Sequence, residues 1–336
     1  MMRCFQGDRK MKHGKKCKID KYTLILIVLL LLLTGLVIAW KLPQKEERYI
    51  HVGIAVYDRS DTFMESYIRE LEDKIGQMRI LGKKVSYEIY DAEGIGSRQE
   101  KQLQEMYAQD YDVMLVNLVE PASAASVLTD AKDADIPVIL FNREIDEKDL
   151  KISKNVWYVG TDARAAGVMQ GKLLKDLWKK QSRILDWNGN GMLDYVLVEG
   201  EESHFDAIRR TSGFLETGAE LPLNQKGNIL AEWKRELAYE KFAALDDEAV
   251  QNVEVVICNN DDMALGVYDY YKEKNLKLPV IIGINNSEEM HQKIMSGEMY
   301  GTIDNKMEDQ VMEICRLMQA ILKKDTGSYQ KVWYST

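Results

Sequence analysis

One short stretch of the chain carries residues that could bind a metal ion. It reads DWNGNGMLD and covers residues 186–194. Asp186, Asn188, Asn190 and Gly191 stand at positions 1, 3, 5 and 6 of an EF-hand calcium loop, which needs a bidentate Glu at position 12. Position 12 here is Leu197, inside an apolar run. The stretch is therefore either a polar turn or a calcium loop whose last carboxylate comes from elsewhere in the chain.

A second group of polar and aromatic residues follows the ends of expected strands. Short apolar runs alternate with amphipathic stretches, which predicts an α/β fold with parallel sheets covered on both faces. In such sheets, ligands bind beyond the carboxyl ends of the strands. The residues at those ends are Asp61, Phe63, Asn117, Asn142, His204, Asp206, Asn259, Asn260, Asn285 and Asn286.

The elements that must position these residues can be read from the same alternation. Strands are expected over 50–57, 84–90, 112–117, 136–142, 156–160, 194–199, 253–258 and 279–284, with a further short one over 228–232. Helices are expected over 62–79, 97–110, 121–134, 162–181, 205–218, 234–247, 261–274, 286–296 and 305–323. Asp61, Asp162 and Asp261 are expected to cap three of these helices.

Motifs of common enzyme classes are missing. The sequence has no HExxH, no GxSxG and no P-loop, and GIG at 94–96 lacks the third glycine of a dinucleotide-binding loop. Ser203 precedes His204, but a catalytic pair also needs the right geometry and an orienting acid. Taken alone, His204 could equally be a structural histidine. We therefore expect a protein that is not an enzyme. The cysteines, which show no metal-binding spacing, are Cys4, Cys17, Cys258 and Cys315.

The charge is distributed unevenly along the 336 residues. The first 40 residues carry eight Lys/Arg against two Asp, a net of +6, and the whole chain is at −9, so the remainder is at −15. Nucleic-acid binding depends on neutralising phosphates with basic side chains. The acidic body therefore argues against a nucleic-acid partner.

The basic head leads into 19 residues without charge, from Tyr22 to Trp40. About 20 apolar residues span a bilayer as a helix. The preceding Lys and Arg residues place the N-terminus in the cytoplasm and the rest outside. A cleaved signal peptide is the alternative, because VIA at 37–39 is an acceptable cleavage triplet, but the apolar core is long for one. We expect a single-pass anchor in the cell membrane and an extracellular binding domain.

Eight segments resemble a known family. VYDRSDTFM, VNLVEPASA, FNREID, YVGTDARAAGVMQG, EGEESHFDAIRRTSGF, VEVVICNNDDMALG, IIGINN and GTIDN come in the order and spacing of the galactose/glucose-binding type I periplasmic binding proteins. The resemblance covers roughly residues 49–325 and implies two Rossmann-like lobes, joined by three crossovers, that close on a sugar. The expected parts are a basic cytoplasmic segment 1–21, an anchor 22–40, a linker 41–48, a first lobe of 49–143 plus about 305–325, and a second lobe of 144–304 plus about 326–336.

The resemblance also implies which residues contact the sugar. Carboxylates accept hydrogen bonds, guanidinium groups donate them and amides do both, which suits a ring of hydroxyls. Two aromatic residues would cover the apolar faces of the sugar ring. Asn285 departs from the family, which has an Asp there, so we expect weaker binding or a different preferred sugar. The implied residues are Asp61, Phe63, Asn117, His204, Asp206, Arg210, Trp233, Asn260, Asn285 and Asn305.

The family also carries a calcium loop that a distant Glu completes. By resemblance, the ligands in this chain would be side-chain oxygens of the loop 186–194, one backbone carbonyl and a carboxylate at the start of a later strand. All are oxygens, as a hard cation requires. A structural Ca²⁺ is therefore expected, and a solvated Asn-Gly turn is the alternative. The implied ligands are Asp186, Asn188, Asn190, Met192, Asp194 and Glu254.

The expected function is that of a membrane-tethered binding protein for galactose, glucose or a related monosaccharide. Its partner would be an ABC permease that receives the sugar. The alternative is a sensing subunit that signals to a membrane histidine kinase or chemoreceptor, and both the spanning anchor and Asn285 favour it. A sugar-responsive repressor would share the fold, but it needs a helix-turn-helix head, whereas residues 1–47 contain an apolar span.

Overall fold

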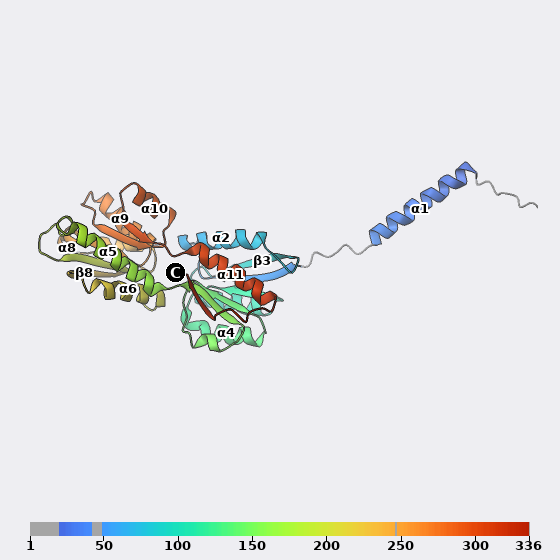
Figure 1. Cartoon of the computed structure of the whole chain (residues 1–336), viewed down its shortest axis with the longest axis horizontal. Helices are drawn as coiled ribbons and strands as arrows, with labels where there is room; N and C mark the ends of the chain where they lie inside the picture. The colour runs from blue at the N-terminus through green and yellow to red at the C-terminus, as the bar shows by residue number, and fades with distance from the viewer. Residues whose placement is uncertain (1–19, 42–48, 246, 336) are drawn as a thin grey trace, which may run out of the picture. The chain divides into compact units, whose positions relative to one another are not determined.

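The computed structural model describes residues 20–41, 49–245 and 247–335, and the chain divides into two compact units, Met1–Arg48 and Tyr49–Thr336 (Figure 1). Residues 1–19 and 42–48, which hold most of the expected basic segment and linker together with Cys4 and Cys17, lie outside the described residues.

The described part of the first unit is the helix α1 (Lys21–Lys41), 21 residues long. Asp20 caps it, because its carboxylate accepts the backbone N–H groups of Tyr22 and Thr23 at 2.9 Å each. The side chains of α1 are described as far as Thr34. Among the described residues, no helix is long and apolar enough to cross a membrane.

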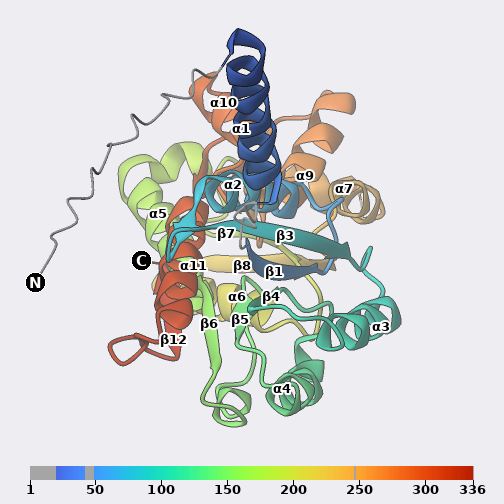
Figure 2. The same ribbon diagram turned by 90° about the vertical axis from the view of Figure 1, so that its right-hand side faces the viewer.

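The first sheet of the second unit has seven strands in the order β12-β6-β5-β4-β1-β3-β2. All neighbours are parallel except β2 and β3. Helices α2 and α11 pack on one face, and α3 and α4 pack on the other (Figure 2). The strands are β1 (Tyr49–Val56), β2 (Arg79–Ile80), β3 (Lys83–Asp91), β4 (Val113–Val116), β5 (Val138–Phe141), β6 (Val156–Thr161) and β12 (Val332–Ser335), and the helices are α2 (Thr62–Gln77), α3 (Gly96–Tyr107), α4 (Ala124–Asp133) and α11 (Met307–Leu322).

The second sheet has five strands in the order β11-β10-β9-β7-β8, all parallel. Helices α5 and α6 cover one face, while α7 and α9 cover the other. The strands are β7 (Leu193–Glu199), β8 (Leu223–Leu230), β9 (Val255–Cys258), β10 (Val280–Ile284) and β11 (Gly301–Ile303), and the helices are α5 (Ala163–Leu185), α6 (Phe205–Gly218), α7 (Arg235–Ala243), α8 (Asp247–Asn252), α9 (Asp261–Glu273) and α10 (Glu288–Met295). The predicted α/β architecture of two parallel sheets is confirmed.

Polar caps fix where several helices begin at the sheet ends. Asp61 accepts the N–H of Met64 at the start of α2, and Asp162 does the same for α5. The expected cap Asp261 is wrong by one residue: Asn260 caps α9, and Asp261 is the first helical residue. Asn260 can do so because its extended backbone, at φ −145°, turns its side chain onto the first turn.

The lobe boundaries differ from those expected. Strand β6 pairs with β5, and β12 pairs with β6, so residues 144–161 and the tail belong to the first lobe and not to the second. The reason is the unpaired edge of β5, which β6 must cover before the chain leaves the sheet. Within the described residues the chain passes between the sheets at 161–163 and again at 303–307, so two of the three expected crossovers are seen.

Some elements were also placed or divided differently from expectation. The short strand expected over 228–232 is the end of a longer one, β8 (Leu223–Leu230), and the helix expected over 234–247 is divided into α7 and α8. Strands β2, β11 and β12 were not expected. Strands β2 and β11 have two and three residues, which is too short for a recognisable pattern of apolar and polar residues, and β12 pairs with a strand that is far away in the sequence.

Candidate ligand-binding site

Residues from both lobes surround one cavity at the carboxyl ends of the two sheets. Nine of the ten sugar-contacting residues expected from the sequence line it. The full lining is Tyr57, Asp61, Phe63, Met64, Asn142, Arg143, His204, Asp206, Arg210, Trp233, Asn260, Asn285 and Asn305.

The first lobe contributes the start of α2. Asp61 uses Oδ1 to cap the helix by accepting the N–H of Met64 at 2.8 Å, and its Oδ2 accepts the hydroxyl of Tyr57 at 2.7 Å. Both bonds hold the carboxylate in one orientation at the cavity wall. Phe63, two residues further along, is half-buried and places its ring on the same wall.

The second lobe contributes the start of α6. His204 is the N-cap, and its Nδ1 accepts the backbone N–H of Asp206 at 3.1 Å. Burial holds the pKa of His204 well below its usual value, so the ring is neutral. Because Nδ1 is an acceptor, the proton lies on Nε2. That N–H is buried and has no partner in the protein.

Asp206 and Arg210 lie on the same face of α6, one turn apart. Burial raises the pKa of Asp206 to about 7, against the opposing charge of Arg210. Burial also lowers the pKa of Arg210, whose Nη1 donates to the carbonyl oxygen of Asn259 at 2.6 Å. Oδ1 of Asp206 and Nε of Arg210 have no partner in the protein.

Trp233 forms a further wall of the cavity. Its φ of +66°, preceded by +50° at Glu232, puts two consecutive side chains in the left-handed region. Such backbone costs free energy and is concentrated at functional sites. A Cβ at Gly200 would lie 2.2 Å from the indole, so only glycine lets the ring pack there. The imidazole of His204 meets the indole edge-on, with ring centroids 5.3 Å apart.

Three amides complete the cavity. Asn260 caps α9 with Oδ1, and its Nδ2 donates to the carbonyl oxygen of Trp233 at 2.9 Å. Nδ2 of Asn305 donates to Oδ1 of Asn285 at 3.3 Å. Oδ1 of Asn305 is buried without a partner, whereas Oδ1 of Asn285 already accepts the hydrogen bond from Asn305. Asn285 has a φ of +133°, a backbone conformation that side-chain-bearing residues seldom adopt.

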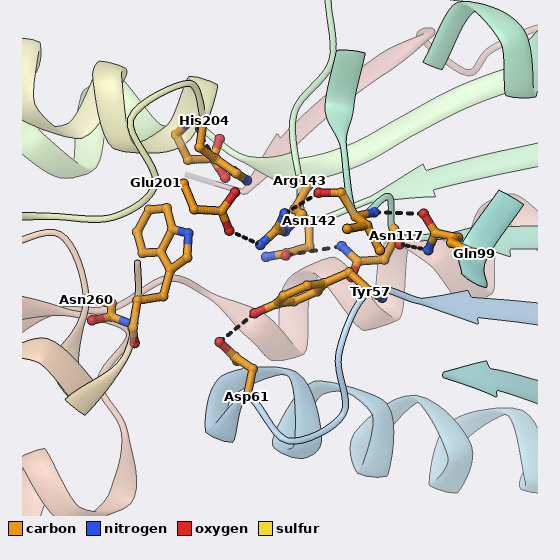
Figure 3. A network of polar contacts seen from close by, with 12 residues as sticks. Tyr57, Asp61, Gln99, Asn117, Asn142, Arg143, Glu201, His204 and Asn260 are labelled. Carbon is orange, nitrogen blue, oxygen red and sulfur yellow. Dashed lines mark hydrogen bonds and ion pairs between the residues drawn. The ribbon is translucent and has the colours of Figure 1, made fainter. Parts of the chain in front are cut away.

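Asn117 is the one predicted residue that does not line the cavity. It is fully buried, and its Oδ1 accepts the N–H of Tyr57 at 3.2 Å. Its Nδ2 donates to the carbonyl oxygen of Phe141 and to Oδ1 of Asn142 (Figure 3). Its side chain therefore supports Tyr57 and Asn142 from behind.

Besides Met64 on α2, three further residues of the cavity, Tyr57, Asn142 and Arg143, were not among the predicted contacts. Each follows the end of β1 or β5 by one or two residues. The rule that ligands bind beyond strand ends already pointed to Asn142, and extending it by one residue finds Arg143. Tyr57 was expected as the last residue of the first strand, which ends one residue earlier, at Val56. Arg143 places its guanidinium over the ring of Tyr57, 3.7 Å from the centroid.

The loop 186–194 is held by hydrogen bonds between its own residues. The N–H of Gly191 donates to Oδ2 of Asp186 at 3.0 Å, and the N–H groups of Asn190 and Met192 donate to the side-chain oxygens of Asn188 and Asn190. Oδ1 of Asp186 is buried without a partner.

Glu254 reaches this loop, as the resemblance implied. It is fully buried, and its carboxylate accepts backbone N–H groups of Trp187, Asn188 and Asp194 at 2.8–3.3 Å. Burial raises its pKa, and the charge of Asp186 adds to that. Among the described residues, no group of three or more His, Cys, Asp or Glu side chains could hold a metal ion. A metal at this loop would therefore depend on amide and backbone oxygens as well.

The family model for the periplasmic binding protein domain matches residues 52–326, and the chain belongs to this family. More particularly, it is similar to the D-galactose/methyl-galactoside binding periplasmic protein MglB of Haemophilus influenzae, at 30% identity over 293 residues, 84% of each chain. These matches define a type I sugar-binding periplasmic protein.

Two further proteins are similar to the chain. The galactofuranose-binding protein YtfQ of Escherichia coli is 27% identical over 248 residues, 71% of this chain and 74% of its own. The fold matches that of an ABC transporter periplasmic solute binding protein from Actinobacillus succinogenes with bound D-allose, with a TM-score of 0.74 at 19% identity, covering 85% of this chain and 95% of that one.

Proposed function

We propose that the chain binds galactose, glucose or a close relative in the cavity between its lobes. Five buried polar atoms without partners at this cavity carry the proposal. Three are donors and two are acceptors, and each costs about 1–3 kcal/mol while it stays unpaired. A hexose has hydroxyls that both donate and accept, so it can satisfy both kinds of atom. The five atoms are Nε2 of His204, Oδ1 of Asp206, Nε of Arg210, Nε1 of Trp233 and Oδ1 of Asn305.

Calorimetric titration of the full chain in detergent tests this proposal. D-galactose, D-glucose and D-xylose are titrated into the unmutated protein and into Asp206→Asn and Trp233→Ala. We expect saturable binding of a hexose, and a loss of at least tenfold in affinity for both variants. The matched control is Glu202→Gln, which changes an exposed residue near the cavity and should bind as the unmutated chain does. If no monosaccharide binds, the proposed ligand class is wrong.

The proposed role of the bound complex is delivery of the sugar to an ABC permease. The similarity to MglB and YtfQ supports it, since both are named as binding proteins for a sugar. We propose further that residues 22–40 tether the domain to the outer face of the cell membrane. The 19 uncharged residues of this stretch and the Lys and Arg residues before it support the tether.

Sensing is the second candidate, in which the loaded domain signals to a membrane histidine kinase or chemoreceptor. It is favoured by the long apolar segment, because a delivery protein needs no direct link across the membrane. Uptake of labelled sugar distinguishes the two roles. Deleting the gene should abolish uptake if the protein delivers sugar. Unchanged uptake, combined with a lost transcriptional response to the sugar, would support sensing.

We also propose that the loop 186–194, together with Glu254, holds a structural Ca²⁺. The unpartnered, buried Oδ1 of Asp186 supports this, because a cation would supply the missing partner. The bond from Gly191 to Asp186 supports it too, since it closes the loop around the first expected ligand. The donors are oxygens throughout, which suits calcium and not a softer metal. Bound calcium would cross-link β7, β9 and the end of α5.

A further inference from the structure

Arg143 joins the two lobes at the wall of the cavity. It follows β5 in the first lobe and is 5% exposed. Its Nη2 donates to Oε1 of Glu201 at 2.6 Å, and Glu201 lies in the loop that follows β7 in the second lobe (Figure 3). The two charges therefore meet across the cleft, beside residues that would contact the sugar.

The first lobe holds Arg143 in place without help from Glu201. Its Nη1 donates to the carbonyl oxygen of Val119 at 2.6 Å, and its guanidinium lies on the ring of Tyr57. Gln99 fixes Val119 in turn, because its Oε1 accepts the N–H of Val119 at 2.7 Å and its Nε2 donates to the carbonyl oxygen of Asn117 at 2.9 Å. Figure 3 shows Asn117 and Gln99 to the right of the arginine. The guanidinium is therefore a fixed charge on the first lobe.

Glu201 belongs to the turn that presents the ligand-binding start of α6. The N–H of His204 donates to the carbonyl oxygen of Glu201 at 3.1 Å. The side chain of Glu201 is 35% exposed, against 4% for that of Arg143, so Glu201 is the more accessible partner. When Glu201 meets Arg143, the turn that carries His204 is held against the cavity.

Two further contacts join the lobes. Arg209 of the second lobe forms an ion pair with Glu144 of the first, and Oγ1 of Thr62 in the first lobe donates to Oδ2 of Asp262 in the second. Thr62 is neutral, so this contact lacks the attraction of opposite charges. The Arg143–Glu201 ion pair is also more sheltered from water on its arginine side, and screening weakens it less than an exposed pair. The Arg143–Glu201 pair is therefore stronger than the contact of Thr62 with Asp262.

We propose that the Arg143–Glu201 ion pair is a closing contact that sets how long the sugar stays bound. The fixed guanidinium of the first lobe receives Glu201 when the second lobe closes, and sugar release requires the pair to separate. This inference rests on the proposed sugar binding. Losing a charge-assisted hydrogen bond of this kind should speed dissociation about tenfold.

The test compares Glu201→Gln, Arg143→Gln and the double variant in the full chain, with Glu202→Gln as the matched control. Dissociation of D-galactose is followed by stopped-flow tryptophan fluorescence. We expect each single variant to release sugar about tenfold faster, with association changed less than twofold. The double variant should release sugar no faster than the faster of the two single variants, because both changes remove the same interaction. Additive effects, or Glu201→Gln dissociating like Glu202→Gln, would overturn the proposal.

A measurement without sugar separates this inference from the proposed function. Hydrogen exchange of the backbone over 200–206 should be faster in Glu201→Gln and in Arg143→Gln than in Glu202→Gln. This readout holds even if galactose is not the ligand, in which case the titration and the galactose dissociation measurement both fail. Equal exchange in all three variants would show that the pair does not hold the turn.

Discussion

Asn285 offers the ligand different hydrogen-bonding groups from the Asp that the family has at this position. Its carbonyl oxygen is committed to Nδ2 of Asn305 at 3.3 Å. The amide NH₂ of Asn285 is then the group left for the cavity, so the site offers a donor where a carboxylate would offer acceptors. An NH₂ group in place of a carboxylate oxygen therefore changes which hydroxyls of a sugar find a hydrogen-bond partner at this position.

Asn285→Asp should tighten binding of a hexose by about fivefold, because it restores a charge-assisted acceptor worth roughly 1 kcal/mol. Titration with galactose, glucose and xylose checks this result. Asp61→Ala is the control and should abolish binding, although it also removes the cap of α2, so its melting temperature must be measured as well. Unchanged affinity and ranking of the three sugars would show that residue 285 does not contact the ligand.

Buried acids should make the ligand-free protein less stable as the pH rises from 5 to 8. Burial raises the pKa of Asp206 to about 7 and those of Asp261 and Asp262 to about 6, above the value near 3.8 of an exposed Asp. The folded state therefore binds protons more tightly than the unfolded state. Its extra stability is complete below pH 4 and is lost as the pH rises through 6 and 7.

Melting temperatures measured across this range test the effect. One unit of pKa is about 1.4 kcal/mol, which shifts the melting temperature of a domain this large by roughly 2–4 °C. Asp206→Asn should lose part of the pH dependence, because an amide does not titrate. If the melting temperature of Asp206→Asn falls with pH as steeply as that of the unmutated chain, Asp206 is not one of the acids that cause the pH dependence.

At the scale of elements, strand ends and caps were predictable, whereas short strands and hidden side chains were not. The expected helix 205–218 matches α6, because its cap, amphipathic pattern and end are all local. Asn117 follows a strand as the cavity residues do, yet its side chain is buried behind Asn142. The sequence pattern locates the backbone of Asn117, and only packing decides which way its side chain turns.

The loop between α5 and β7 should respond to calcium through Glu254. We expect Glu254→Gln to lower the melting temperature and to abolish the stabilisation given by added Ca²⁺, which reaches about 2.7 kcal/mol at 100 times the dissociation constant. Calorimetry with and without chelator measures both. Glu202→Gln should keep the full calcium response.

The calcium response is the decisive readout for this variant. Glu254 also accepts three backbone N–H groups, so a lower melting temperature alone could arise from their loss. If a chelator leaves the melting temperature of the unmutated chain unchanged, the loop is a polar turn.

At the scale of the whole molecule, residues 22–40 determine whether the binding domain is tethered to the membrane or released. We expect the mature protein to keep them and to resist extraction from membranes by alkaline carbonate, since 19 uncharged residues can span the bilayer. N-terminal sequencing and immunoblotting of the extracted fractions check this prediction. A mature chain that begins at Trp40 would identify the segment as a cleaved signal peptide.

The assignment of residues to lobes could be predicted only in part. The core of each lobe follows from apolar runs that alternate with amphipathic stretches, such as those of β4 in the first lobe and β9 in the second. The position of β12 could not be predicted, because its four residues pair with a strand more than 160 positions earlier. Pairing over such a distance depends on the finished sheet and leaves no local pattern.

Strand β12 limits how far the chain can be truncated at its C-terminus. It covers the outer edge of β6, and Oη of Tyr334 within it donates to Oε1 of Glu144, which Arg209 of the second lobe also contacts. Deleting residues 332–336 would uncover a row of unpaired backbone groups. We expect such a protein to self-associate by edge-to-edge strand pairing, and light scattering would show this. A tail-deleted chain that stays monodisperse would show that β12 does not protect this edge.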